Sequence, residues 1–129
     1  MAELGNLITW TYTGRAQIPL QWATISVLKK TPNGKVSLFA VRITDKDGKI
    51  KPMSIPTPNI DNSLSPGKTP AFAICDILVE HPNYRILLIE NVQVFADTTS
   101  LQELLLIPLP EGGSETSTMD VVRITPQDL

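Results

Sequence analysis

The centre of the fold is encoded by the stretch Phe72-Ala73-Ile74-Cys75-Asp76-Ile77-Leu78-Val79. Successive side chains of a strand point to opposite faces, and here both faces are apolar apart from Asp76. A short run that is apolar on both sides is typical of a strand inside a sheet rather than at its edge. We therefore predict a central strand over residues 72–79, with the single cysteine, Cys75, packed in the core.

The chain before this stretch carries four further strand patterns, over residues 7–13, 22–28, 36–44 and 49–55. Thr31-Pro32-Asn33-Gly34 should join the second and third of them as a hairpin. Asp45-Lys46-Asp47-Gly48 marks the next turn. Pro52 cannot donate to a ladder, which places the fourth strand at a sheet edge. The proline-rich segment 56–70 is predicted to be a long ordered loop of the same domain.

After the central stretch, strands are predicted over residues 86–95 and 101–109, and residues 118–125 form either a last strand or an extended tail. Seven or eight short strands without intervening helices favour an all-β, antiparallel β-sandwich. We expect one sandwich domain over residues 1–111. A C-terminal extension over residues 112–129 would add a strand to it or donate one to a neighbouring chain.

Composition limits the classes of function. The chain has 129 residues, which is enough for one core, and its net charge of -2 leaves no basic footprint for nucleic acid. One cysteine excludes an internal disulfide. We find no basic, apolar leader at the N-terminus and no apolar run near the ~20 residues that span a bilayer. These features predict cytoplasmic synthesis without a signal peptide or membrane span.

Catalytic and metal-binding patterns are incomplete. His81 is the only histidine, and it stands at a strand end. Gly67-Lys68-Thr69 ends a P-loop motif, but its first glycine is missing. Asp45 and Asp47 lack the further ligands of a calcium loop. We therefore predict a non-enzymatic chain with no catalytic, cofactor-binding or metal-ligating residue.

A resemblance accompanies these patterns. The run Ile18-Pro19-Leu20-Gln21-Trp22-Ala23-Thr24-Ile25-Ser26-Val27 resembles the "P-L-x-x-A-T-V-x-V" opening of transthyretin-like domains, the type called carboxypeptidase regulatory-like. Residues 44–49, 76–84 and 91–99 are similar to later motifs of that family, with Asn83 and Asp97 where glycine is usual. Both residue types tolerate left-handed backbone. The resemblance implies a prealbumin-like sandwich.

A narrower resemblance involves Pro56-Thr57-Pro58 and residues 63–67, 91–95, 107–111 and 125–129. Together they are similar to the non-catalytic N-terminal domain of clostridial spore-cortex-lytic proteins. This likeness implies an accessory or structural role and association with the spore.

Two functions follow as hypotheses. The first is a structural module that assembles with itself or another protein through strand edges, with contact residues Met119, Val121, Val122 and Ile124 on the C-terminal strand. The alternative is a module that binds peptidoglycan or another glycan. Trp10, Tyr12, Trp22 and Tyr84 would supply its aromatic platform, although buried anchors are expected to use most of these residues.

Overall fold

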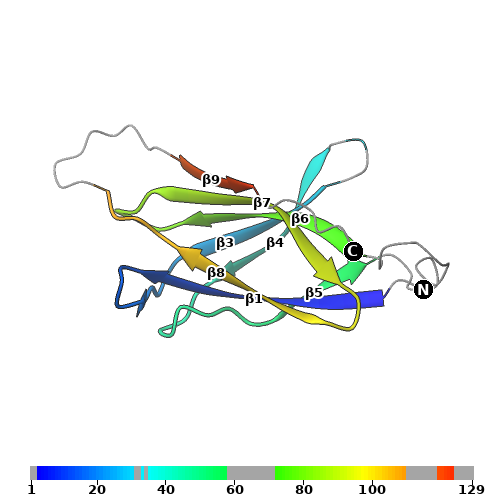
Figure 1. The fold of residues 1–129 in the computed structure, drawn as a ribbon, viewed down its shortest axis with the longest axis horizontal. Helices are drawn as coiled ribbons and strands as arrows, with labels where there is room; N and C mark the ends of the chain where they lie inside the picture. Colours follow the sequence, from blue (N-terminus) through cyan, green and yellow to red (C-terminus); the bar gives the residue numbers. More distant parts are fainter. Residues whose placement is uncertain (1–2, 31–32, 34, 58–71, 110–118, 124–129) are drawn as a thin grey trace.

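The computed structural model describes residues 3–30, 33, 35–57, 72–109 and 119–123, and these residues form two sheets that stack as a sandwich (Figure 1). The predicted all-β sandwich is confirmed. Among the residues described, no helix is long and apolar enough to cross a membrane. The strands are β1 (Glu3–Thr13), β2 (Ile18–Pro19), β3 (Thr24–Lys30), β4 (Val36–Ile43), β5 (Met53–Thr57), β6 (Phe72–Glu80), β7 (Ile86–Phe95), β8 (Thr99–Leu105) and β9 (Met119–Arg123).

The five-stranded sheet has the order β4-β3-β6-β7-β9. Strand β6 lies between β3 and β7, which confirms the central position predicted from its two apolar faces. Strands β3 and β4 pair antiparallel, as the predicted hairpin requires. Strand β9 runs parallel to β7, with Met119 opposite Ile86, and forms the second edge of this sheet.

The four-stranded sheet is built on β1. One side of β1 pairs antiparallel with β5 at residues 3–7 and with β2 at residues 12–13, and the other side pairs with β8 in parallel. Strand β5 lies at an edge, as predicted, but it begins at Met53 and includes Pro56, so the predicted bounds of 49–55 were shifted. Pro52, which has no N–H, stands just before it. The rest of the predicted loop, residues 58–70, lies outside the described residues.

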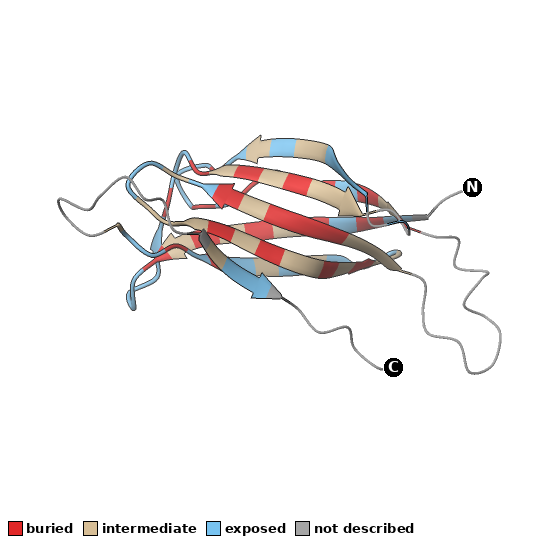
Figure 2. Ribbon diagram, turned by 90° about the horizontal axis from the view of Figure 1, so that it is seen from above, coloured by how far each residue is buried: buried red, intermediate tan, exposed pale blue. Residues whose placement is uncertain are grey.

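The core lies between the sheets and takes apolar residues from both (Figure 2). Cys75 is fully buried there, as predicted. The largest fully buried aliphatic side chains are Leu7, Ile25, Met53, Ile55, Ile77, Leu104 and Leu106. Burying one such side chain contributes roughly 1.5–3 kcal/mol, so this interface supplies most of the driving force for folding.

Two β-bulges decide which residues face the core. In β7, Ile89 pairs with Ile77 and Val92 pairs with Cys75, so Glu90 and Asn91 together oppose the single residue Asp76. The extra residue reverses the alternation, and Asn91 accommodates it with a φ of 66°. A second bulge in β4 leaves Phe39 between the pairs Val27–Ala40 and Leu28–Leu38.

Tight turns hold the strand ends. The Asp45–Gly48 turn is confirmed as a turn, with the Gly48 N–H donating to the Asp45 carbonyl at 2.9 Å and Gly48 at a φ of 75°. Asn83 and Asp97 adopt left-handed backbone, as their residue types allow. Trp22 also has a positive φ, 71°, which no sequence pattern predicted and which is rare for a bulky side chain.

Candidate interaction surface

Strand β4, one of the two edges of the five-stranded sheet, carries several exposed apolar side chains. Strand β4 pairs only with β3, so the backbone groups on its other side have no strand partner among the described residues. Four of its apolar side chains are largely exposed: Val36 49%, Leu38 61%, Val41 43% and Ile43 60%. We call these four residues the β4 patch.

The bulge at Phe39 puts the whole β4 patch on one face. Val36 and Leu38 pair with Lys30 and Leu28, and after the bulge Val41 and Ile43 pair with Ser26 and Thr24. Residues in direct register point to the same face, and here that face is opposite the buried Ile25 and Val27. Without the extra residue, half of the patch would turn toward the core. Phe39 itself packs against the core.

An apolar row continues from this patch across the outer face of the sheet. Val41 pairs with Ser26, Ser26 with Leu78, Leu78 with Leu88, and Leu88 with Val121. The row therefore crosses all five strands with four aliphatic side chains. Val121 at its far end is 50% exposed. No described element covers this face, so a partner that lies on it would bury apolar surface.

The predicted contact residues of the C-terminal strand are only partly displayed. Val121 and Val122 are 50% and 48% exposed on β9, whereas Ile124 lies outside the described residues. Asp120 anchors β9 to the sheet, because its carboxylate accepts from Arg85 at 2.6–3.0 Å in a bidentate pair that raises the pKa of the Arg85 guanidinium. The described strand therefore pairs within its own chain. Its role as a contact stays a prediction.

The outer face of the four-stranded sheet carries aromatic side chains. Thr9 and Thr11 of β1 are only 1% and 0% exposed, so their side chains face the core. Trp10 and Tyr12, which alternate with them, therefore point outward. The two aromatic rings are 4.6 Å apart. Desolvation and the neighbouring Glu103 raise the pKa of the Tyr12 hydroxyl, which donates to Glu103 at 3.4 Å. The expectation that most aromatic side chains are buried is therefore wrong for Trp10 and Tyr12.

The other two aromatic residues of the predicted platform lie elsewhere. Tyr84 packs against the core and against His81, with ring centroids 5.0 Å apart. Trp22 is 68% exposed in the connection between β2 and β3. The structure therefore brings together Trp10 and Tyr12 only. Sequence alternation separated the two faces of β1 but did not tell which one meets the core.

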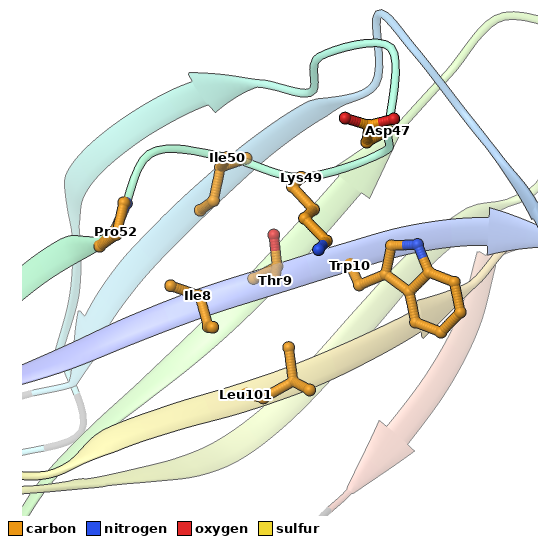
Figure 3. Close-up of a pocket in the computed structure, with 8 residues that line it drawn as sticks. All are labelled: Ile8, Thr9, Trp10, Asp47, Lys49, Ile50, Pro52 and Leu101. Carbon is orange, nitrogen blue, oxygen red and sulfur yellow. The ribbon is translucent and has the colours of Figure 1, made fainter.

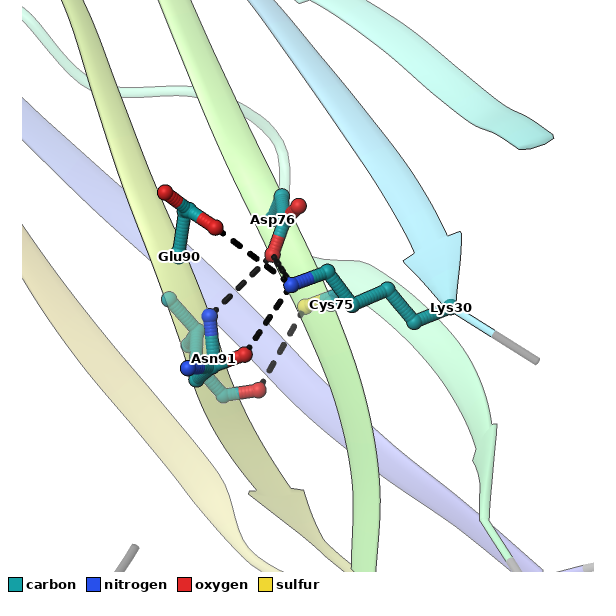
Figure 4. Close-up of polar contacts among 6 residues, drawn as sticks. Lys30, Cys75, Asp76, Glu90 and Asn91 are labelled. Carbon is teal, nitrogen blue, oxygen red and sulfur yellow. Dashed lines mark hydrogen bonds and ion pairs between the residues drawn. The ribbon is translucent and has the colours of Figure 1, made fainter. Parts of the chain in front are cut away.

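A charged cluster fixes the bulge of β7 (Figure 4). The carboxylate of Asp76, whose side chain is 7% exposed, accepts the backbone N–H of Asn91 at 3.1 Å and lies 3.4 Å from Lys30 Nζ. Lys30 also contacts Glu90 at 3.5 Å and donates to the Asn91 side-chain oxygen at 3.1 Å. One lysine thus faces two carboxylates, and one of these, Asp76, also accepts the backbone N–H at the bulge. We interpret this cluster as structural.

The described residues around Cys75 and His81 do not form a catalytic or metal-binding group. Burial, and secondly Asp76, raise the pKa of the Cys75 thiol to about 12, which keeps it protonated and unreactive. His81 lies near two backbone carbonyl oxygens, those of Pro82 and Gln21. Within the part of the chain that is described, no three His, Cys, Asp or Glu residues are grouped as metal ligands.

Comparison with known proteins identifies solved structures of similar architecture. No protein-family model matches the chain, and no curated protein is similar to it in sequence. Among solved structures it is similar to catechol 1,2-dioxygenase from Acinetobacter sp. ADP1, at a TM-score of 0.56 and 12% identity, over 95% of this chain and 59% of that one. Wild-type catechol 1,2-dioxygenase from Acinetobacter radioresistens gives a TM-score of 0.52 and 13% identity, over 92% and 58% of the two chains.

Transthyretin from Sparus aurata is also similar, at a TM-score of 0.48 and 17% identity over 81% of this chain and 90% of that one. The chain spans about three-fifths of the length of the two dioxygenases. At these identities the likeness shows the fold alone. The chain is an all-β sandwich, with transthyretin among the structures that it is similar to.

Proposed function

We propose that this chain is a non-catalytic interaction module that associates with copies of itself through the edge of β4 and the adjoining apolar row. The observation that carries the proposal is the β4 patch. Strand β4 has two features that protect natural sheet edges, the bulge at Phe39 and the charge of Arg42, but it has neither proline nor glycine, and no described element covers its open side. Its open backbone and its apolar side chains would both gain partners in one contact.

The simplest arrangement is a two-fold pairing of β4 with β4. Antiparallel pairing of two identical edges is self-complementary, since each strand offers the other the same groups. It would join two five-stranded sheets and place the apolar rows of both copies on a continuous face. Further copies could then stack on that face, which is how a dimer becomes a larger assembly.

Exchange of residues 112–129 between chains remains a second route within this proposal. The pairing of β9 with β7 that the chain makes internally is the same pairing that a donated strand would make in a neighbour. The finer resemblance to the N-terminal domain of clostridial spore-cortex-lytic proteins, and with it a location in the spore, belongs to the proposal as well.

Light scattering of the full chain tests self-association. We expect wild type to exceed the mass of one chain, 14.2 kDa, and Val41→Glu with Leu38→Glu to return to it, because a buried unpaired carboxylate is costly. Leu105→Glu, at a 47% exposed position on the other sheet, is the matched control and should not change the mass. Deletion of residues 112–129 reports on strand exchange. Wild type at the mass of one chain throughout a concentration series would overturn the proposal.

A second candidate, a glycan-binding module, is favoured by the outward Trp10–Tyr12 pair. Aromatic rings with one apolar face and a nearby carboxylate, here Glu103, suit a sugar that stacks and donates hydrogen bonds. Co-sedimentation with purified peptidoglycan that is lost in Trp10→Ala would support it. Equal sedimentation of wild type and that variant would count against this surface.

A further inference from the structure

A cavity of about 610 Å³ opens on the four-stranded sheet (Figure 3). It exists because β1 lacks a continuous neighbour on one side. Pairing with β5 ends at Leu7 opposite Met53, and the next contact is the single bridge between Trp10 and Lys49. Pro52, which cannot donate to β1, precedes β5 at the point where the two segments separate. The cavity is the space between β1 and the segment 49–52.

The walls of the cavity are mainly apolar. Ile8 and Leu101 are opposite each other in the β1–β8 register, so both belong to the outer face of the sheet. Ile50 and Pro52 form the opposite wall, and Trp10 closes one end. A cavity of this volume and lining matches small-molecule sites, which are typically about 300–1,000 Å³ and mostly apolar.

Three polar residues also line the cavity. Thr9 is 1% exposed, and its Oγ1 has no hydrogen-bond partner although it is buried. This hydroxyl faces the core and is closed to a ligand in the cavity. In Figure 3 the Lys49 side chain points toward β1, whereas Asp47 stands on the turn at the rim. Lys49 is the only cation among the described residues that line the cavity.

We propose that this cavity binds a small ring compound that carries a carboxylate. The ring would pack between Leu101, Ile8 and Trp10, while the carboxylate accepts from the Lys49 ammonium. An anionic acceptor fits Lys49, because an ammonium group only donates hydrogen bonds. The Asp47 carboxylate at the rim repels the carboxylate of the ligand, so it weakens the binding without blocking it.

Fluorescence of Trp10 tests the proposal. The full chain has two tryptophans, so we would use a Trp22→Phe background in which Trp10 is the only one. With 2-naphthoate as the probe, we expect saturable quenching. Leu101→Glu should abolish it, and Lys49→Gln should weaken it about tenfold, the effect of losing one hydrogen bond to a charged group. Asp47→Asn should tighten binding several-fold.

Matched variants separate this site from other apolar surfaces. Leu105→Glu changes an exposed leucine of β8 that does not line the cavity, and it should leave the quenching intact. Neutral 2-naphthamide should bind more weakly than 2-naphthoate in wild type and equally in Lys49→Gln. Circular dichroism of each variant establishes that it is folded, as expected for exposed positions.

Three results with the naphthalene probes would overturn the proposal. They are the absence of saturable quenching by 2-naphthoate, unchanged quenching in Leu101→Glu, and equal binding of acid and amide in wild type. Quenching by N-acetylglucosamine in place of 2-naphthoate would also overturn it and would favour the glycan candidate on the same sheet. None of these readouts depends on whether the chain associates with itself, because light scattering of the same samples reports that separately.

Discussion

Replacing Gly48 by alanine is expected to lower the free energy of unfolding by about 3 kcal/mol. Two costs combine at this position. Gly48 has a φ of 75°, a conformation that residues with a Cβ rarely adopt. A Cβ built there would also lie 2.2 Å from the backbone oxygen of Thr11, which no side-chain rotation can relieve. The close approach is the contact that ties the Asp45 turn to β1, through the Thr11 N–H that donates to the Gly48 carbonyl at 2.8 Å.

Gly14 provides the control for Gly48. It has the same φ of 75°, but a Cβ there would meet nothing within 4 Å. Gly14→Ala should therefore show the conformational cost alone, about 1 kcal/mol. Urea unfolding followed by circular dichroism measures both, provided that the m-values agree. Equal losses for the two variants would show that the contact with Thr11 adds nothing.

Several elements were predictable because their signals are local. Two apolar faces identified β6 as a central strand, and Asp45–Gly48 identified a turn. In that turn the Asp45 carboxylate accepts the backbone N–H groups of Asp47 and Lys49. These features depend on residues within a few positions of each other. Side-chain alternation and turn chemistry therefore determine them without knowledge of the rest of the chain.

The orientation of β1 was not predictable from its own alternation. The pattern separates threonines from aromatics, and aromatics would ordinarily be assigned to the core. The structure buries Thr9 and Thr11 instead, since they share a face with Leu7 and Thr11 lies opposite the buried Leu104 of β8. That neighbour is far away in sequence and pairs in parallel, so no local signal indicates it. Trp10 and Tyr12 were named as members of an aromatic platform, but their outward orientation and the cavity were not predicted, for the same reason.

The bulge of β7, in contrast, has a signal that sequence reading could have found. Leu87 and Ile89 are two residues apart, as are Val92 and Val94, but the two pairs are out of phase. All four are buried, which is possible only if one extra residue lies between the pairs. A break in the phase of alternating apolar residues therefore predicts a bulge at Glu90–Asn91. The chemistry that stabilises it, supplied by Lys30 and Asp76 from other strands, is not visible in that segment.

The second large effect is expected at this bulge. Asp76→Ala should lower the free energy of unfolding by about 2–3 kcal/mol, since it removes a nearly buried carboxylate that pairs with Lys30. The change also leaves the Asn91 N–H without its acceptor. Because Asn91 holds the extra residue in a left-handed conformation, the bulge would lose a main constraint. A one-residue slip would turn Asn91 and Gln93 toward the core in place of Val92 and Val94.

Three variants separate charge from hydrogen bonding at Asp76. Asp76→Asn can still accept the Asn91 N–H but no longer pairs with the Lys30 ammonium, so its loss should be smaller than that of Asp76→Ala. Lys30→Met removes the ammonium that lies close to both Asp76 and Glu90 and should also destabilise the fold. The double variant Lys30→Met with Asp76→Asn should be more stable than the two separate losses predict, because it removes both charges together.

Urea unfolding gives these free energies, and hydrogen exchange locates their origin. If Asp76 fixes the bulge, the Asn91 amide should lose protection in Asp76→Ala and keep most of it in Asp76→Asn. A merely general loss of stability would instead lower protection evenly across β6 and β7. Equal stability of Asp76→Ala and wild type would show that the extra residue is held by its neighbours in the sheet, and that the charged cluster has another purpose than the register of β7.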